Sequence, residues 1–358
     1  NLRLKGSYQK SILELSVDVA GEAEGLRLHY QITPMQELHW HDGRPLLQNS
    51  KGQTGQPFHS SDGPSQLGSI GLRGNSFRDN IQIEAAMPWT PEHPNLYVLE
   101  LELSRNGWPV DKVTSYFGMR DLAMQKDNNG VQRLLLNREF IFQLGMLDQG
   151  YWPDGLYTAA TDEALCEDII VAKNLGFNML RKHVKVEPSR WYAWCDRLGL
   201  MVWQDMPSGD RSIGPNDPVV ARHAASSLQF EVEFDSIMDG LQNHPSVVAW
   251  VPFNEGWGQY ETARIARFVS QKDPTRWLDA VSGWVDRPVG QMLDIHAYPG
   301  PAIPPLDAKR AAVLGEFGGL GLPVEGHTWQ EKKNWGYRSY DTTDALTSAY
   351  EQLITNLR

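Results

Sequence analysis

Two glutamates, Glu255 and Glu316, each follow an apolar run and are followed by a glycine turn. The runs 247–253 and 311–315 are typical of buried strands that deliver a carboxylate at their carboxyl ends. A sheet interior has no structural reason to hold either charge, because burying an unpaired carboxylate is costly. Two carboxylates that face one cavity are the minimum equipment for glycoside hydrolysis, one as the acid and one as the nucleophile or base.

The segments that would position these glutamates alternate between strand and helix patterns after about residue 135. Thr161 is suited to cap one of the helices, and a long helix is expected over 218–242. The strand patterns cover 140–145, 177–183, 200–205, 247–254, 278–284, 292–298 and 311–317. Such alternation predicts parallel βα units, and seven of them favour a TIM barrel over an open sheet.

The C-terminal segment 345–358 carries an apolar stripe at helical spacing, and the chain ends there. A barrel should close with an eighth strand after such a helix. The sequence therefore predicts a (β/α)8 TIM barrel over residues 123–358 that is truncated before its eighth strand. Residues 1–122 instead alternate with period two in several short runs separated by turn residues, which predicts an antiparallel β-sandwich domain.

The composition restricts the partners of the chain. Its 358 residues carry 41% hydrophobic and 22% charged side chains, which is ordinary for a globular protein. The net charge of −11 makes nucleic acid a poor partner, and no apolar run is long enough to predict a membrane span. The chain starts at Asn1 without a leader, so either a signal was removed or the chain is a fragment. The compartment stays open, with a periplasmic or secreted protein favoured over a cytoplasmic one.

Polar and aromatic residues lie at the carboxyl ends of the predicted strands, where such a barrel places its active site. The substrate-binding candidates are Trp152, Arg181, His183, Asp205, Asn254, Trp257, Trp284, His296 and Tyr298. Each has a structural alternative. The histidines can bond backbone instead of sugar hydroxyls, the tryptophans can pack in the core, and Asp205 can anchor neighbouring loops. Trp329 and Trp335, in the loop after Glu316, are candidates for a lid.

Several motifs in order resemble glycoside hydrolase family 2, the family of many β-galactosidases, β-mannosidases and β-glucuronidases. Residues 88–97 resemble the Trp-x-Pro-Glu-x-Pro-x-Leu-Tyr stretch of its immunoglobulin-like domain, and 117–120 resemble the Phe-Gly-Phe-Arg exit into its barrel. The segments 176–183, 195–202 and 243–250 resemble its second, third and fourth strand regions. The resemblance implies an immunoglobulin-like domain followed by the barrel, with the family's sugar-binding jelly roll absent.

The resemblance also implies roles for the two glutamates. Glu255 resembles the acid/base, with Asn254 placed to bond the 2-hydroxyl of the sugar, and Glu316 resembles the nucleophile. A retaining enzyme needs these carboxyl groups roughly 5–5.5 Å apart. The nucleophile must stay ionised, which Arg181 can favour by its charge and Tyr298 by a hydrogen bond.

Two rival classes remain. A metal-dependent hydrolase usually carries a short histidine motif that this chain lacks, so we expect no metal site. A non-catalytic carbohydrate-binding protein would keep the fold without turnover.

Within the enzyme class we expect an exo-acting glycosidase with a neutral, β-galactoside-like substrate, and a β-mannosidase or other pyranosidase as the alternative. No cofactor is required, although some relatives bind structural metal ions, and the expected partner is an oligo- or polysaccharide. The oligomeric state is not readable.

Overall fold

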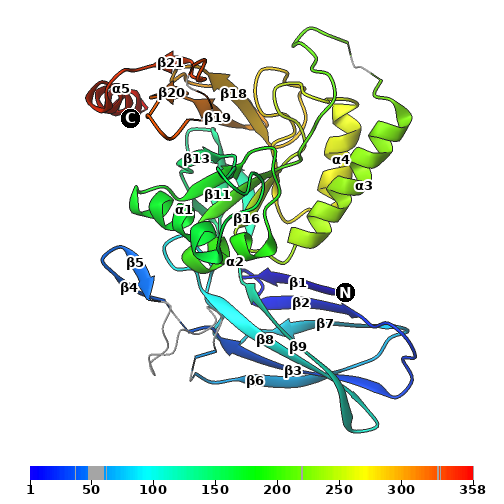
Figure 1. Cartoon of the computed structure of the whole chain (residues 1–358). Coiled ribbons are helices and arrows are strands. Elements are labelled where there is room, and N and C mark those ends of the chain that lie inside the picture. The colour runs from blue at the N-terminus through cyan, green and yellow to red at the C-terminus, as the bar shows by residue number, and fades with distance from the viewer. Residues whose placement is uncertain are drawn as a thin grey trace.

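The computed structural model describes residues 1–36, 38–46, 60–61, 63–218, 221–328, 330 and 332–357. Its N-terminal part is a sandwich of two antiparallel sheets, at the bottom of Figure 1. One sheet has the order β1-β2-β7, from β1 (Leu2–Ser7), β2 (Ile12–Asp18) and β7 (Ser76–Gln82). The other has the order β6-β3-β8-β9, from β6 (Gln66–Gly71), β3 (Leu26–Pro34), β8 (Leu96–Arg105) and β9 (Trp108–Gly118).

Alternating apolar residues of the two sheets meet inside the sandwich, where Leu13, Phe77 and Leu99 are fully buried. This is the pattern that period-two spacing predicts, so the expectation of a sandwich is confirmed. A small hairpin, β4 (His39–His41) with β5 (Arg44–Leu46), follows β3 in the chain.

A short antiparallel sheet connects the sandwich to the rest of the chain. It consists of β10 (Leu122–Lys126), β11 (Gln132–Leu136) and β12 (Glu139–Phe140). The predicted strand over 140–145 is wrong, because Phe140 and Phe142 are exposed and the first parallel strand begins only at Gly145. The predicted domain boundary after residue 122 stays a prediction. It falls at the start of β10, just after the last sandwich strand.

The second part of the chain alternates strands and helices. Five parallel strands form one sheet, namely β13 (Gly145–Asp148), β14 (Met179–Lys182), β15 (Met201–Asp205), β16 (Val247–Val251) and β17 (Trp277–Leu278). The connecting helices are α1 (Asp162–Asn174), α2 (Ser189–Leu198), α3 (Ala224–Leu241) and α4 (Thr262–Lys272). Thr161 caps α1 as expected, because its hydroxyl accepts a bond from the Ala164 N–H at 3.1 Å.

The last two predicted strands form a separate parallel pair, β18 (Met292–Ala297) with β19 (Ala311–Phe317). The expected closed barrel is therefore not seen in the described ranges, where the seven strands β13 to β19 divide into parallel sheets of five and two. No described helix connects β17 to β18 or β18 to β19, so these segments do not repeat the βα unit. The chain continues through β20 (Leu320–Gly321), β21 (Arg338–Ser339) and α5 (Thr343–Thr355), beside β18 and β19 in Figure 1.

The sandwich and the α/β part each have their own core, and a third apolar cluster is shared between them. Trp89 and Leu96 pack in the same buried cluster as Met201, Trp203 and Val248. The strands β15 and β16 are buried along their whole length, which explains their continuous apolar runs. Among the described helices, none combines the length and apolar character needed to cross a membrane.

Candidate active site

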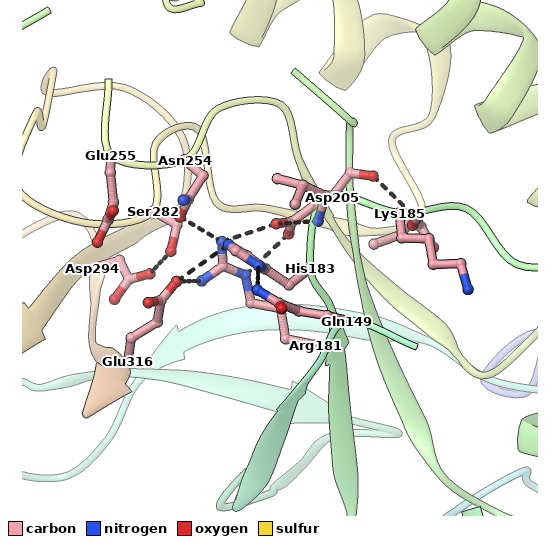
Figure 2. A network of polar contacts seen from close by, with 12 residues as sticks. Gln149, Arg181, His183, Lys185, Asp205, Asn254, Glu255, Ser282, Asp294 and Glu316 are labelled. Atoms are coloured by element: carbon pink, nitrogen blue, oxygen red, sulfur yellow. Dashed lines mark hydrogen bonds and ion pairs between the residues drawn. The ribbon is translucent and has the colours of Figure 1, made fainter. Parts of the chain in front are cut away.

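Side chains at or just beyond the carboxyl ends of four parallel strands meet in one polar network (Figure 2). β14 supplies Arg181, β15 supplies Asp205, and β19 supplies Glu316. The segment directly after β16 supplies Asn254 and Glu255. The structure therefore brings both candidate glutamates to the same edge of the α/β part.

Arg181 is 2% exposed and divides its N–H groups among three partners. Its Nε and Nη2 donate to the two carboxylate oxygens of Asp205, both at 3.0 Å. Nη1 donates to Glu316 Oε1 at 2.7 Å, and Nη2 also donates to Asn254 Oδ1 at 2.9 Å. Both carboxylate oxygens of Asp205 thus accept hydrogen bonds from the guanidinium. The contacts of Asp205 are those of a residue that anchors Arg181.

Glu316 is buried and held as an anion. Burial alone would raise the pKa of Glu316, but the Arg181 guanidinium, His296 and the Tyr298 hydroxyl outweigh burial and lower it. The Tyr298 hydroxyl donates to Glu316 Oε2, while Oε1 takes the Arg181 bond. Burial and the Glu316 carboxylate raise the pKa of Tyr298, so its hydroxyl keeps its hydrogen. Each oxygen of Glu316 therefore has its own donor, which suits a nucleophile that must stay ionised.

Glu255 and Gly256 form a turn in which both residues have a left-handed backbone conformation. The φ of Glu255 is +51°, and Gly256 follows with a φ of +79°. A Cβ on Gly256 would come 2.3 Å from the Ile213 carbonyl oxygen, so this position requires glycine. A left-handed glutamate is an uncommon and mildly strained conformation that recurs at functional sites. The Glu255 N–H donates to the Ser282 carbonyl at 2.8 Å, which fixes the turn against the segment after β17.

The two glutamates are close. One ligand-type atom from each of Glu255, His296 and Glu316 lies within 4.8 Å of the other two, the one such trio in the described part of the chain. These residue types can bind a metal ion. However, the Arg181 guanidinium already places a positive charge 2.7 Å from Glu316, and a divalent cation beside it would be repelled. The trio therefore suits a pair of catalytic carboxyl groups better than a metal centre.

His183 offers a hydrogen-bond donor to the same site. Its Nδ1 lies 3.1 Å from Gln149 Nε2, which donates to it, so the hydrogen of a neutral ring sits on Nε2. That Nε2 is buried without a hydrogen-bond partner and lies 3.8 Å from Glu316 Oε1. Burial lowers the pKa of His183, which keeps the ring neutral at neutral pH. An unpartnered donor at this position is suited to a hydroxyl of a bound sugar.

The aromatic candidates differ in their surroundings. Trp257 is 49% exposed and Trp284 is 47% exposed, whereas Trp152 is partly buried against the core of the α/β part. Trp284 contacts the ring of His296 edge-on, with ring centroids 5.6 Å apart. The exposed pair is thus available to stack on a substrate, and the packing of Trp152 favours its structural alternative.

The loop after Glu316 also reaches the site. Tyr337 stacks on Tyr298 with ring centroids 3.9 Å apart, and Trp335 contacts Tyr337 and is exposed. The lid candidate Trp329 lies outside the described residues.

Sequence reasoning missed Ser282, Asp279 and Asp294. Asp294 Oδ2 accepts a hydrogen bond from Ser282 Oγ at 2.6 Å, and Ser282 Oγ lies 2.8 Å from His296 Nε2. A signal was present for one of them, since Asp294 and His296 are two residues apart on β18 and therefore share a face. Ser282 had no such signal.

A β-sandwich followed by parallel βα units, with two carboxyl groups close together at the strand ends, is the arrangement expected of an enzyme that hydrolyses glycosidic bonds. The family model for glycosyl hydrolases family 2 matches residues 5–120, and the model for the TIM barrel domain of the same family matches residues 158–298. The chain belongs to glycosyl hydrolases family 2.

Two curated relatives are similar to parts of the chain. A provisionally assigned β-glucuronidase of Formosa agariphila is 24% identical over 279 residues, which are 77% of this chain and 25% of the relative. A β-galactosidase of Lactococcus lactis is 30% identical over 182 residues, or 49% of this chain and 17% of the relative. The matched region thus spans a quarter or less of the length of these relatives.

Solved structures share the fold. The crystal structure of a Parabacteroides merdae β-glucuronidase aligns with a TM-score of 0.55 at 17% identity and covers 77% of this chain and 32% of that one. At this level of identity the likeness concerns the fold alone.

Proposed function

We propose that this protein is a retaining, exo-acting glycoside hydrolase in which Glu316 is the nucleophile and Glu255 the acid/base. The observation that carries this proposal is the separation of the two glutamates, whose closest ligand-type oxygens lie within 4.8 Å. Retaining enzymes hold their carboxyl groups about 5–5.5 Å apart, whereas inverting enzymes leave roughly 6.5–9.5 Å for a water molecule.

In the first step a Glu316 oxygen attacks the anomeric carbon and the glycosidic C–O bond breaks. The proton of Glu255 goes to the departing oxygen, so the leaving group departs as an alcohol. Glu316 is suited to attack because Arg181 and Tyr298 keep it ionised. Asn254 Oδ1 accepts a hydrogen bond from Arg181. The amide nitrogen of Asn254 therefore remains available to donate to a sugar hydroxyl.

In the second step Glu255, now a carboxylate, takes a proton from water. The resulting hydroxide attacks the anomeric carbon, and the bond between sugar and Glu316 breaks. Two inversions at one carbon restore the original configuration. No step needs a cofactor or a metal ion, because Arg181 and the tyrosine hydroxyl supply the charge stabilisation.

For the substrate we propose a neutral, β-galactoside-like terminal sugar on an oligo- or polysaccharide. The buried cation of the site, Arg181, is already divided among Asp205, Glu316 and Asn254. The neighbouring Lys182 is likewise bound, to Asp148 at 2.7 Å and Glu187 at 3.0 Å. A glucuronide carboxylate would therefore lack a free partner in this network. A β-mannoside or another neutral pyranoside is the alternative.

The test is a screen of 4-nitrophenyl β-glycosides with the full-length protein, covering galactoside, mannoside, glucoside, arabinopyranoside and glucuronide. We expect turnover of a neutral glycoside with release of the β-anomer first. Glu316→Ala should lose turnover and recover part of it with azide, forming the α-glycosyl azide. Glu255→Ala with azide should form the β-glycosyl azide. Binding of a sugar without turnover of any glycoside would point to the carbohydrate-binding alternative.

A further inference from the structure

His296 lies between the two glutamates, and its ring is fully buried. Its Nδ1 is 2.7 Å from Glu255 Oε1 and 3.5 Å from Glu316 Oε2. The longer of these contacts is to an oxygen that already takes the Tyr298 hydrogen bond. The hydrogen bond to Glu255 is therefore the main contact of Nδ1. A ring buried this way, with both nitrogens engaged, is poorly placed to bind a sugar hydroxyl.

The other end of the ring is fixed by a serine and an aspartate. Ser282 Oγ lies 2.8 Å from His296 Nε2 and donates to Asp294 Oδ2 at 2.6 Å. A hydroxyl has a single hydrogen, so Ser282 gives it to the carboxylate and accepts from Nε2. Asp294 is itself held, because its Oδ1 accepts from the Gly315 N–H at 2.6 Å, directly before Glu316. Burial and the neighbouring Asp294 carboxylate raise the pKa of Asp279 well above its usual range, and burial also raises the pKa of Asp294.

The consequence falls on Glu255. Its Oε1 is bound by His296, while its Oε2 has no partner among the described residues, and the side chain is 18% exposed. A glutamate has three rotatable side-chain bonds, so without this contact the carboxyl group would sample several orientations. With Oε1 bound, Oε2 is the oxygen left free for an incoming leaving group.

We propose that His296 is a positioning residue for the acid/base. Asp294 and Ser282 orient its ring, in which both nitrogens donate. Nδ1 donates to Glu255 Oε1, so the transferable proton of Glu255 is held on Oε2 and passes from there to the leaving oxygen. This inference rests on the proposed function and assigns the Asp294–Ser282–His296 chain to the step in which Glu255 protonates the leaving group.

The test compares two substrates that differ only in the leaving group, the 2,4-dinitrophenyl and phenyl glycosides of the sugar found in the screen. Dinitrophenolate departs without a proton, whereas phenolate needs acid assistance. We expect His296→Leu to lower kcat/KM for the phenyl glycoside about 100-fold and to change the dinitrophenyl value less than about threefold, since general acid catalysis contributes roughly 10²–10⁴-fold. Ser282→Ala should show the same selectivity with a smaller loss.

A conservative variant separates positioning from packing. His296→Asn keeps a hydrogen-bonding group near the place of Nδ1, so it should recover about tenfold of the phenyl activity that His296→Leu loses. Ile295→Val, a neighbour on the opposite face of β18, is the control and should leave both substrates unchanged.

Equal losses on both substrates would overturn the proposal, because they would mean that His296 acts on Glu316 or only on the fold. Unchanged activity in His296→Leu would overturn it as well. Failure of the unaltered protein to hydrolyse either glycoside would instead count against the proposed function.

Discussion

Arg181 both forms a buried ion pair with Asp205 and donates a hydrogen bond to Glu316. Its buried guanidinium is bound by Asp205 through two parallel hydrogen bonds and presents a third N–H group to Glu316. Such a planar arrangement cannot be reproduced by a lysine, whose ammonium is a point charge on a flexible stem. Removing one partner of a buried ion pair costs about 3–5 kcal/mol, because the remaining charge is left uncompensated.

We therefore expect Arg181→Met to move the acidic limb of the kcat/KM profile to higher pH. Arg181 is the leading cause that lowers the pKa of Glu316 below its ordinary value of 4.5, so its loss raises that pKa and the nucleophile is protonated earlier as the pH falls. Arg181→Lys should give a smaller displacement. A pH–rate series on the hydrolysed glycoside measures both, and an acidic limb that stays in place would contradict the role given to Arg181.

Removal of metal ions should leave the activity unchanged. The trio of Glu255, His296 and Glu316 has the Arg181 guanidinium beside it, 2.7 Å from Glu316 Oε1, and this positive charge repels a metal ion. We expect dialysis against EDTA to alter kcat/KM by less than about twofold, with a Zn²⁺-treated sample as the comparison. Loss of turnover that Zn²⁺ or Mn²⁺ restores would favour the metal-dependent rival.

At the scale of elements, helix ends determine how the sandwich meets the α/β part. α2 ends at Leu198 and is capped by Gly199, whose φ of +73° is left-handed and whose N–H donates to the Cys195 carbonyl. The backbone of Pro91, in the loop before β8, approaches so closely that a Cβ on Gly199 would lie 2.4 Å from its carbonyl oxygen. Gly199 is needed both for its conformation and for this contact.

We expect Gly199→Ala to destabilise the protein by about 2–3 kcal/mol, of which about 1 kcal/mol is the cost of the left-handed conformation. Gly176, after α1, is the matched control, because its φ is +88° and nothing lies within 4 Å of an added Cβ. Urea unfolding of Gly199→Ala and Gly176→Ala compares their losses in the free energy of unfolding, and the difference is the cost of the clash with Pro91. Equal losses would show that the approach of Pro91 does not matter.

At the scale of the whole molecule, Asp196 connects the two parts of the chain. Its carboxylate accepts from the Tyr116 hydroxyl of β9 at 2.7 Å and from the Ser246 N–H at 2.8 Å, and its Oδ2 lies 2.6 Å from His244 Nδ1. The Trp89 indole donates to the Asp196 carbonyl at 2.8 Å. Since this residue is fully buried, its contacts are shielded from solvent and couple the sandwich to the segment before β16.

Asp196→Asn should destabilise the whole protein by about 2–4 kcal/mol, because an amide replaces one of the acceptor oxygens by a donor and removes the charge. We expect the unfolding transition to stay single and to move to lower temperature. Asp111→Asn, at an exposed position on β9, is the control and should leave it in place. Calorimetry that showed separate transitions for the sandwich and the α/β part would contradict the coupling.

The sequence by itself determined what depends on neighbours along the chain. Period-two runs predicted the sandwich, the alternation of strands and helices predicted the parallel βα units, and Thr161 predicted the start of α1. The two glutamates were found because apolar strands that end in a carboxylate and a glycine are a local pattern. Each of these follows from backbone geometry and burial within a few residues.

Only the tertiary structure decided how distant segments combine. The division of the strands β13 to β19 into sheets of five and two depends on which edges pair, and that choice has no local signature. The place of His296 between Glu255 and Ser282 likewise depends on three segments far apart in sequence. The left-handed turn at Glu255 occurs where Gly256 packs closely against Ile213, a residue more than 40 positions earlier in the chain. Hydrogen bonds at 2.6–2.8 Å are set by side-chain positions that no spacing rule reports.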